Sequence, residues 1–272
     1  MQNERQKKIE EYERLGLFDK DIEDDPPTRE LLPDEIKYYP KGFFKKIKTS
    51  FAFFLAYRYA AKLEKQGLFI IKDIVGAENL NVTGGCVLTA NHFSPLDSFI
   101  MNRVFDVSER KGEIYRVIKE GNYTSFPGFY GFLMRNCNTL PLSQNRATML
   151  KFMRATDKIL KDGNCILIYP EQSMWYNYKK PKPLKPGAFD IAARSDVPVV
   201  PSFITMSDSG RIGEDGEPIQ EHTVFIGKPI YPDPSLSRRE QSQKIRDEVF
   251  QFNKSVYESY YGVKLEYLKA EN

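Results

Sequence analysis

Short apolar runs that alternate with helical stretches are the feature that most constrains the fold of this chain. Apolar, β-branched runs fall at residues 69–75, 86–90, 115–118, 139–142, 165–169, 199–204 and 224–226. Stretches with helical spacing lie between several of them, at residues 95–104, 129–135, 146–160, 187–194 and 237–260. Buried strands separated by helices predict an α/β fold, a three-layer domain with a mainly parallel central sheet.

The size and composition suit such a domain. The chain has 272 residues, of which 41% are hydrophobic and 28% charged, so a disordered chain is excluded. No uninterrupted apolar run approaches twenty residues, and the charged start leads into no apolar stretch. We therefore expect neither a polytopic membrane protein nor a secretory signal. The net charge of +3 is too small to indicate a nucleic-acid partner.

Cysteine and histidine usage points to a reducing compartment without a metal site. Cys86, Cys137 and Cys165 are odd in number, widely spaced and set among apolar residues, which is typical of reduced, buried thiols. With only two histidines and no Cys-x-x-Cys pair, we expect no metal and no cofactor.

Charge is distributed unevenly along the first part of the chain. Residues 1–35 carry twelve acids and six bases, whereas residues 36–66 carry eight bases and one acid. The Asp-Asp-Pro-Pro run at residues 24–27 cannot continue a helix and indicates a linker. We therefore divide the chain into an acidic N-terminal arm and linker (1–36), a basic aromatic helix (37–67) and a main domain (68–272).

Residues 43–65 have helical periodicity with an apolar stripe and lysines crowded at the N-terminal end. The stripe consists of Phe44, Ile47, Phe51, Phe54 and Leu55, and Tyr59 and Leu63 extend it. A basic, aromatic, amphipathic helix of this kind can lie in a membrane interface. The alternative is that the stripe packs on the domain, and periodicity alone leaves both open.

A histidine and an aspartate follow the second predicted strand. The sequence Asn-His-Phe-Ser-Pro-Leu-Asp places Asn91, His92 and Asp97 at the carboxyl end of the strand, where α/β folds bind their ligands. Part of the pattern has a structural explanation, since Ser94 and Asp97 resemble a capping box at a helix start. Capping does not account for Asn91 and His92.

The functional interpretation gives His92 and Asp97 one joint task. A neutral imidazole can take the proton of a hydroxyl, and a carboxylate on the other ring nitrogen fixes the tautomer and stabilises the imidazolium. The chain has no P-loop, no Gly-x-Ser-x-Gly elbow and no dinucleotide fingerprint. A His–Asp pair without a serine nucleophile suggests direct attack by a substrate hydroxyl.

Four segments in order resemble the glycerolipid acyltransferases of the 1-acyl-sn-glycerol-3-phosphate acyltransferase type. The segment from Asn91 to Asp97 resembles the first motif of that family. Lys119-Glu120 with Pro127 and Gly131 resembles the segment before the second motif, and Tyr-Pro-Glu-Gln-Ser at residues 169–173 resembles the third. Residues 185–188 and Val-Pro-Val-Val-Pro at 197–201 match the stretch leading into the fourth. The resemblance covers roughly residues 68–230.

The resemblance implies transfer of a fatty acyl group from a thioester, acyl-coenzyme A or acyl-carrier protein, to a lysophospholipid hydroxyl. His92 would be the base and Asp97 the residue that orients it, with 1-acyl-glycerol-3-phosphate as the default acceptor and phosphatidate as product. It also implies an N-terminal helical element that docks on the membrane, which favours a peripheral protein on the cytoplasmic face. The residues expected to bind substrate are Asn91, Lys119, Arg146, Glu171, Ser173, Lys185, Gly187 and Pro198.

The sequence departs from the family pattern where arginines normally bind the phosphate of the acceptor. Gln144 stands at one such position in the second motif, and Gln172, Ser173 and Met174 replace Gly, Thr and Arg in the third. Arg146, Lys182 or Lys185 could substitute as cations. Alternatively, the acceptor is another hydroxyl lipid such as a glycolipid, or the protein binds lipid without turnover.

Two further positions are better explained by structure than by chemistry. The aromatic cluster Trp175, Tyr176 and Tyr178 could line an acyl entry or the membrane face, but we favour a packed loop. His222 has no acidic partner nearby in the sequence, and we interpret it as structural.

Overall fold

The computed structural model describes residues 4–23, 28–40, 42–214 and 216–269, and the strands within them form one sheet. The strands are β1 (Ile70–Val75), β2 (Cys86–Thr89), β3 (Ile114–Ile118), β4 (Thr139–Pro141), β5 (Cys165–Ile168), β6 (Val199–Ile212) and β7 (Pro218–Ile226). Their order is β1-β7-β6-β2-β5-β3-β4, and every neighbouring pair is parallel except β6 and β7. The predicted mainly parallel sheet is therefore confirmed.

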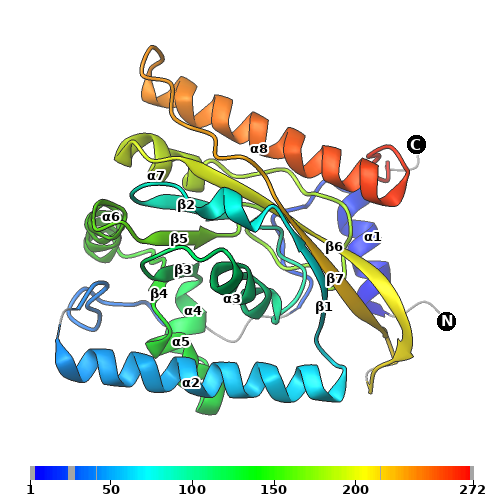
Figure 1. Cartoon of the computed structure of the whole chain (residues 1–272), viewed down its shortest axis with the longest axis horizontal. Coiled ribbons are helices and arrows are strands. Elements are labelled where there is room, and N and C mark those ends of the chain that lie inside the picture. The colour runs from blue at the N-terminus through cyan, green and yellow to red at the C-terminus, as the bar shows by residue number, and fades with distance from the viewer. Residues whose placement is uncertain (1–3, 24–27, 41, 215, 270–272) are drawn as a thin grey trace.

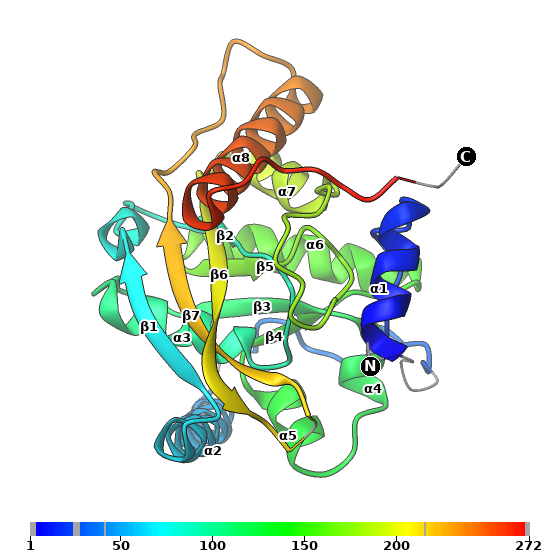
Figure 2. The ribbon, with the colours of Figure 1, turned by 90° about the vertical axis from the view of Figure 1, so that its right-hand side faces the viewer.

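Helices cover both faces of the sheet (Figures 1 and 2). They are α1 (Glu4–Arg14), α2 (Phe43–Gln66), η1 (Ala77–Leu80), α3 (Asp97–Val107), α4 (Glu120–Thr124), α5 (Gly128–Asn136), α6 (Arg146–Lys161), α7 (Gly187–Ser195) and α8 (Arg238–Tyr261). Side chains point alternately to the two faces of the sheet and so contribute to two cores. Val87 packs with α6, α7 and α8, whereas Leu88 packs with α3 and η1. The domain thus has the three layers that the sequence predicts.

The last two strands extend beyond their apolar runs. The sequence predicts strands over 199–204 and 224–226, but β6 continues to Ile212 and β7 begins at Pro218. Backbone pairing between the two strands continues through polar residues such as Asp208 and Gln220. An antiparallel ladder needs no buried side chains to form its hydrogen bonds, so hydrophobicity alone underestimates its length.

The α2 helix packs on the domain through alanines and exposes the aromatic residues of its first turn. Ala52, Ala56 and Ala60 are buried, the first two in a core with α5 and the third in the core around α3. The side chains of Phe43 and Phe44 are 74% and 82% exposed. Ile47, Phe51 and Phe54 of the predicted stripe are half exposed, and the ring of Phe51 also lies against that of Phe132 in α5, with centroids 6.2 Å apart. None of the helices in the described part of the chain has the length and apolarity to span a membrane.

The N-terminal residues that the structure describes pack on the main domain. Leu31, Ile36 and Tyr38 are buried in the core shared with α6 and α7. Helix α1 lies beside the C-terminal segment (Figure 2), where the backbone N–H of Leu268 donates to Glu13 Oε1 at 2.8 Å. The linker predicted at residues 24–27 lies outside the described residues.

Candidate active site

Two neighbouring parallel strands bring the candidate residues together. β2 pairs with β5 so that Thr89 lies opposite Ile168, and both strands therefore end at the same edge of the sheet. The loop after β2 carries His92, and the loop after β5 carries Tyr169 and Glu171. Segments 79 residues apart in the sequence meet here, because the backbone N–H of His92 donates to Glu171 Oε2 at 3.3 Å.

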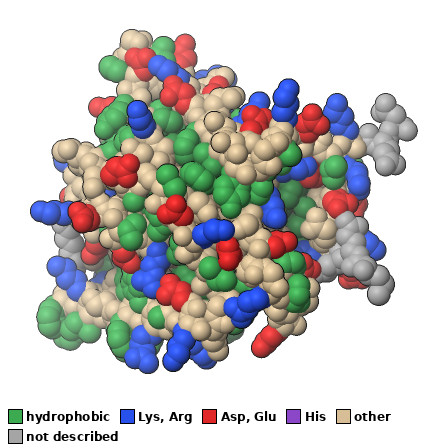
Figure 3. Space-filling model, turned by 45° about the vertical axis from the view of Figure 1, so that its right-hand side comes forward, with side chains coloured by type: hydrophobic (Ala, Val, Ile, Leu, Met, Phe, Trp, Pro, Cys, Tyr) green, Lys and Arg blue, Asp and Glu red, His purple; other side chains and the backbone are tan. Residues whose placement is uncertain are grey.

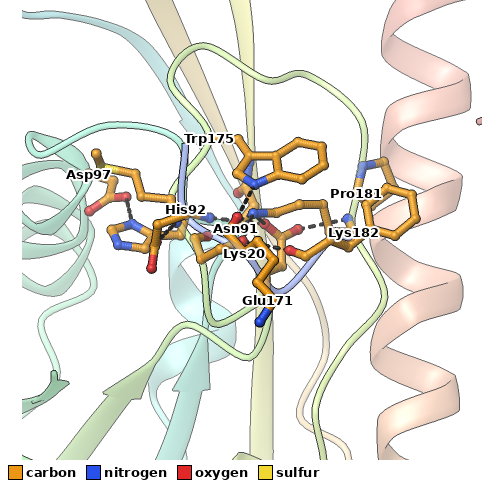
Figure 4. A network of polar contacts seen from close by, with 12 residues as sticks. Lys20, Asn91, His92, Asp97, Glu171, Trp175, Pro181 and Lys182 are labelled. Atoms are coloured by element: carbon orange, nitrogen blue, oxygen red, sulfur yellow. Dashed lines mark hydrogen bonds and ion pairs between the residues drawn. The ribbon is translucent and has the colours of Figure 1, made fainter. Parts of the chain in front are cut away.

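His92 and Asp97 form a close pair at this edge (Figure 4). Nδ1 of His92 lies 2.5 Å from Oδ2 of Asp97. The Asp97 side chain is only 1% exposed, whereas the His92 side chain is 24% exposed. The ring of Tyr169 stacks on the imidazole with centroids 4.5 Å apart. A buried carboxylate on Nδ1 leaves Nε2 as the nitrogen that can accept a proton from a ligand.

The capping-box interpretation of Ser94 and Asp97 is wrong. Helix α3 begins at Asp97 with Leu96 as its N-cap residue, and no side chain caps it. The hydroxyl of Ser94 accepts instead from the backbone N–H of Leu96 at 3.2 Å. Because Pro95 and Leu96 form a turn before the helix, Asp97 is the first residue of α3 and not the third, as a capping box requires, and its carboxylate reaches His92.

Asn91 fixes the loop rather than facing a ligand. It is buried, its Nδ2 donates to the carbonyl of Ile204 at 3.0 Å, and its Oδ1 accepts from the N–H of Ile204 at 2.8 Å. Both amide atoms therefore bond β6. Asn91 thus helps to hold the loop that carries His92.

A buried ion pair supports the loop after β5. Oε1 of Glu171 accepts from the backbone N–H of Lys182 at 3.0 Å, and Nζ of Lys182 lies 3.6 Å from Oε2 of Glu171. Nζ of Lys182 also donates to the carbonyl of Ser173 at 2.7 Å and to its hydroxyl at 2.9 Å. Burial raises the pKa of Glu171 and lowers the pKa of Lys182, and each charge partly offsets the effect on the other.

The aromatic cluster is a packed loop, as expected. Trp175 is fully buried, and the Lys182 ammonium lies 5.0 Å from the centroid of its ring. The backbone N–H of Trp175 donates to the carbonyl of His92 at 3.3 Å. His222 is buried and bonds the carbonyl of Ile70 through Nδ1 at 2.9 Å, with its ring stacked on Phe93. Its placement fits the structural interpretation.

Three predicted substrate-binding residues lie away from the His92–Asp97 pair or lack the expected geometry. Arg146 is exposed at the first residue of α6, beyond edge strand β4. Pro198 precedes β6 and its carbonyl accepts from the N–H of Val87, so it lies at the opposite end of the strands from His92. Gly187 begins α7, but a Cβ there would meet nothing within 4 Å, so no close approach requires glycine.

The remaining predicted residues lie around the loop after β5. Ser173 is fully buried, and its hydroxyl donates to the carbonyl of Phe18 at 2.6 Å. Lys119 and Lys185 form ion pairs with Asp21 and Asp19, the second at 3.0 Å. Sequence reasoning missed the acidic partners, because nothing local in the sequence predicts contacts that join residues 98 and 166 positions apart.

Comparison with known proteins finds similarity to acyltransferases. A family model described as Acyltransferase matches residues 72–205. The chloroplastic 1-acyl-sn-glycerol-3-phosphate acyltransferase of Brassica napus is 31% identical over 169 residues, which cover 60% of this chain and 46% of that protein. The 1-acyl-sn-glycerol-3-phosphate acyltransferase of Saccharomyces cerevisiae is 26% identical over 133 residues, 48% of this chain and 42% of that one. Residues 72–205 therefore resemble the acyltransferase family, and both of these relatives are named as glycerolipid acyltransferases.

The chain spans about half the length of the curated relatives that it matches. It is also similar to a crystal structure of the 1-acyl-sn-glycerophosphate acyltransferase PlsC from Thermotoga maritima. That likeness has a TM-score of 0.49 at 18% identity and covers 82% of this chain and 81% of the other.

The positions that depart from the family pattern differ in backbone conformation and in burial. Gln172, at the position where the motif usually has glycine, has a φ of 73°, a conformation that favours glycine. Met174, which stands in place of an arginine, is partly buried. The buried cation that contacts this loop is Lys182. Gln144, in place of the other arginine, is exposed beyond β4.

Proposed function

We propose that this protein is an O-acyltransferase that moves a fatty acyl group from a thioester to the free hydroxyl of 1-acyl-glycerol-3-phosphate, forming phosphatidate. The observation that carries the proposal is the His92–Asp97 pair, 2.5 Å apart at the strand edge that also carries Glu171. The match to the acyltransferase family and the activity named for the two curated relatives support it. The donor is acyl-coenzyme A or acyl-carrier protein.

The proposed chemistry uses His92 as base and then as acid. Nε2 of His92 removes the proton of the acceptor hydroxyl, and the oxygen attacks the carbonyl carbon of the thioester. The new C–O bond forms, the C–S bond breaks, and the leaving thiolate takes the proton back from Nε2. Asp97 holds the tautomer with Nδ1 protonated and stabilises the imidazolium between the two steps.

Glu171 and Lys182 contribute by positioning. Glu171 bonds the backbone N–H of His92, and Lys182 bonds Glu171 and Ser173 from a fully buried position. A buried carboxylate is costly without such partners, so the pair holds both loops in one arrangement. We therefore propose that Glu171 helps to position His92.

We also propose that α2 docks on the membrane that holds the lipid substrates. Its exposed apolar side chains are Phe43, Phe44, Ile47, Phe51 and Phe54, with Lys45, Lys46 and Lys48 among them. Hydrophobic and basic side chains gather at the lower edge of the surface in Figure 3, where Figure 1 places α2. Aromatic rings among headgroups and lysines near anionic lipid favour an interfacial helix.

The cytoplasmic face of the membrane is the proposed location. Cys86, Cys137 and Cys165 are buried and free. Cys86 and Cys165 lie on adjacent strands with sulfur atoms 3.4 Å apart, unbonded, which fits a reducing compartment.

The test is an acyl-transfer assay with acyl-coenzyme A and acyl-carrier protein against lysophosphatidate in mixed micelles. We expect phosphatidate with at least one donor. No product with either donor would overturn the proposed reaction.

A second acceptor class has one observation in its favour. The positions of both family arginines hold Gln144 and Met174, and Lys119 and Lys185 are paired with carboxylates. An acceptor without phosphate, such as a glycolipid, would need fewer cations. An acceptor panel in the same assay separates the two classes by their kcat/KM values.

A further inference from the structure

The N-terminal segment, residues 4–23, packs against the loop after β5. Ile9 and Ile22 are buried in a cluster with Trp175. Nε1 of Trp175 donates to the carbonyl of Lys20 at 2.7 Å, a contact that Figure 4 shows beside Glu171 and Lys182. The segment is therefore anchored to the same loop that positions His92.

Three carboxylates of this segment pair with three lysines of the main domain. Asp21 pairs with Lys119, Asp19 with Lys185 at 3.0 Å, and Glu13 with Lys180 at 2.6 Å. The acidic arm seen in the sequence thus neutralises cations around the candidate site. Among these lysines, Lys119 directly follows β3 and Lys185 precedes α7.

Asp21 differs from the other two carboxylates because it also bonds the backbone of the third motif. Oδ2 pairs with Nζ of Lys119, and Oδ1 accepts from the backbone N–H of Met174 at 3.2 Å. Lys119 follows β3 and Met174 lies in the loop after β5, and these strands are neighbours that end at the edge occupied by His92. An ammonium and a backbone N–H that converge on one carboxylate form an anion-binding position.

We infer that Asp21 is a specificity-determining residue, whose carboxylate occupies the anion position formed by Lys119 and the Met174 amide and competes there with the phosphate of the acceptor. The inference rests on the proposed function and deepens it. A phosphate carries up to two charges and three strong acceptor oxygens, so it can displace a single carboxylate. The Asp21 side chain is 27% exposed, which leaves it a path to solvent.

The competition predicts the direction in which the KM for the acceptor changes. In Asp21→Asn, Lys119 keeps its charge and loses its ion pair with Asp21, so the KM for lysophosphatidate falls about two- to fivefold, the size of one partly exposed ion pair. The KM for 1-acylglycerol, which lacks the phosphate, does not change. Lys119→Gln raises the KM for lysophosphatidate, and adding Asp21→Asn to it has no further effect.

The matched control is Glu23→Gln. It removes the same charge from the same segment, but Glu23 pairs with Arg5 inside the segment, at 2.5 Å. Its KM for lysophosphatidate stays at the wild-type value. Thermal unfolding of each variant checks that the segment remains folded on the domain.

Phosphorus NMR titration with glycerol 3-phosphate tests binding without turnover, and Asp21→Asn binds this probe more tightly than the wild type. If Asp21→Asn changes neither the KM for lysophosphatidate nor the affinity for glycerol 3-phosphate, the inference is overturned. A KM that rises in Asp21→Asn also overturns it, because Asp21 would then orient Lys119 for the substrate. A wild type without acyl transfer overturns the proposed function instead, and the probe titration still decides the role of Asp21.

Discussion

Asp97 Oδ2 lies 2.5 Å from Nδ1 of His92, and the carboxylate is buried while the imidazole reaches solvent. The first residue of α3 thereby sets the orientation of a side chain five residues earlier. Neither β2 nor α3 alone creates this pair. It depends on the turn at Pro95 and Leu96, which brings the helix start back toward the strand end.

We expect Asp97→Asn to lower kcat for acyl transfer by on the order of 10³-fold or more. An amide in this position can donate to Nδ1 and so favours the tautomer with Nε2 protonated, which cannot act as base. Initial rates with saturating acceptor measure the effect. A rate within tenfold of the wild type contradicts the assigned role of Asp97.

The buried pair of Lys182 and Glu171 gives a stability prediction. Lys182→Met leaves Glu171 without its cation and should reduce the free energy of unfolding by about 3–5 kcal/mol. The double variant Lys182→Met with Glu171→Gln should be less destabilised than the single variant. Urea unfolding followed by circular dichroism compares them. Equal losses in the single and double variants would show that the two charges are not coupled.

His222 predicts how stability depends on pH. Burial lowers the pKa of His222 in the folded protein below its ordinary value of 6.5, so below about pH 6.5 the unfolded chain binds more protons than the folded one. The stability is therefore fully present above pH 6.5 and falls as the pH drops. From pH 7.5 to 5.5 His222 therefore contributes a loss of stability.

His222→Asn keeps a side-chain N–H for the carbonyl of Ile70 and removes the titrating group. Its free energy of unfolding should decrease less than that of the wild type over the same pH range. Denaturant unfolding at both pH values gives the difference. Parallel pH profiles for the two proteins would mean that His222 titrates normally in the folded state.

The α2 surface predicts vesicle binding. Phe43→Ser with Phe44→Ser should weaken binding to anionic phospholipid vesicles by about tenfold or more, since two exposed rings no longer enter the interface. Vesicle sedimentation measures the partition. The control is Ile212→Ser with Tyr231→Ser, which removes two apolar side chains that are 64% and 62% exposed outside α2. Equal partition of both double variants would refute docking through α2.

The sequence predicts the architecture well because burial is encoded locally. Each apolar run that indicated a strand became one, and Val87 and Leu88 show why, since neighbouring residues of one strand fill the two opposite cores. The ends of β6 and β7 were underestimated because their outer residues are held by backbone pairing between polar positions.

The candidate site was predictable only where its contacts are short in sequence or carried by motifs. His92 and Asp97 are five residues apart, and the strand–helix context suggested their contact. Tyr169, which stacks on His92, went unremarked although it begins the third-motif segment. Asp21 could not be assigned, because its contacts to Lys119 and Met174 exist only once the whole chain has folded.

Acyl transfer by His92→Ala tests the central claim most directly. The measurement is phosphatidate formation from lysophosphatidate and the better of the two donors, with His222→Asn as the matched control for losing a histidine. We predict that His92→Ala lowers kcat on the order of a hundredfold or more while His222→Asn stays near the wild type. Turnover by His92→Ala at the wild-type rate would contradict the account, because the base would then lie elsewhere.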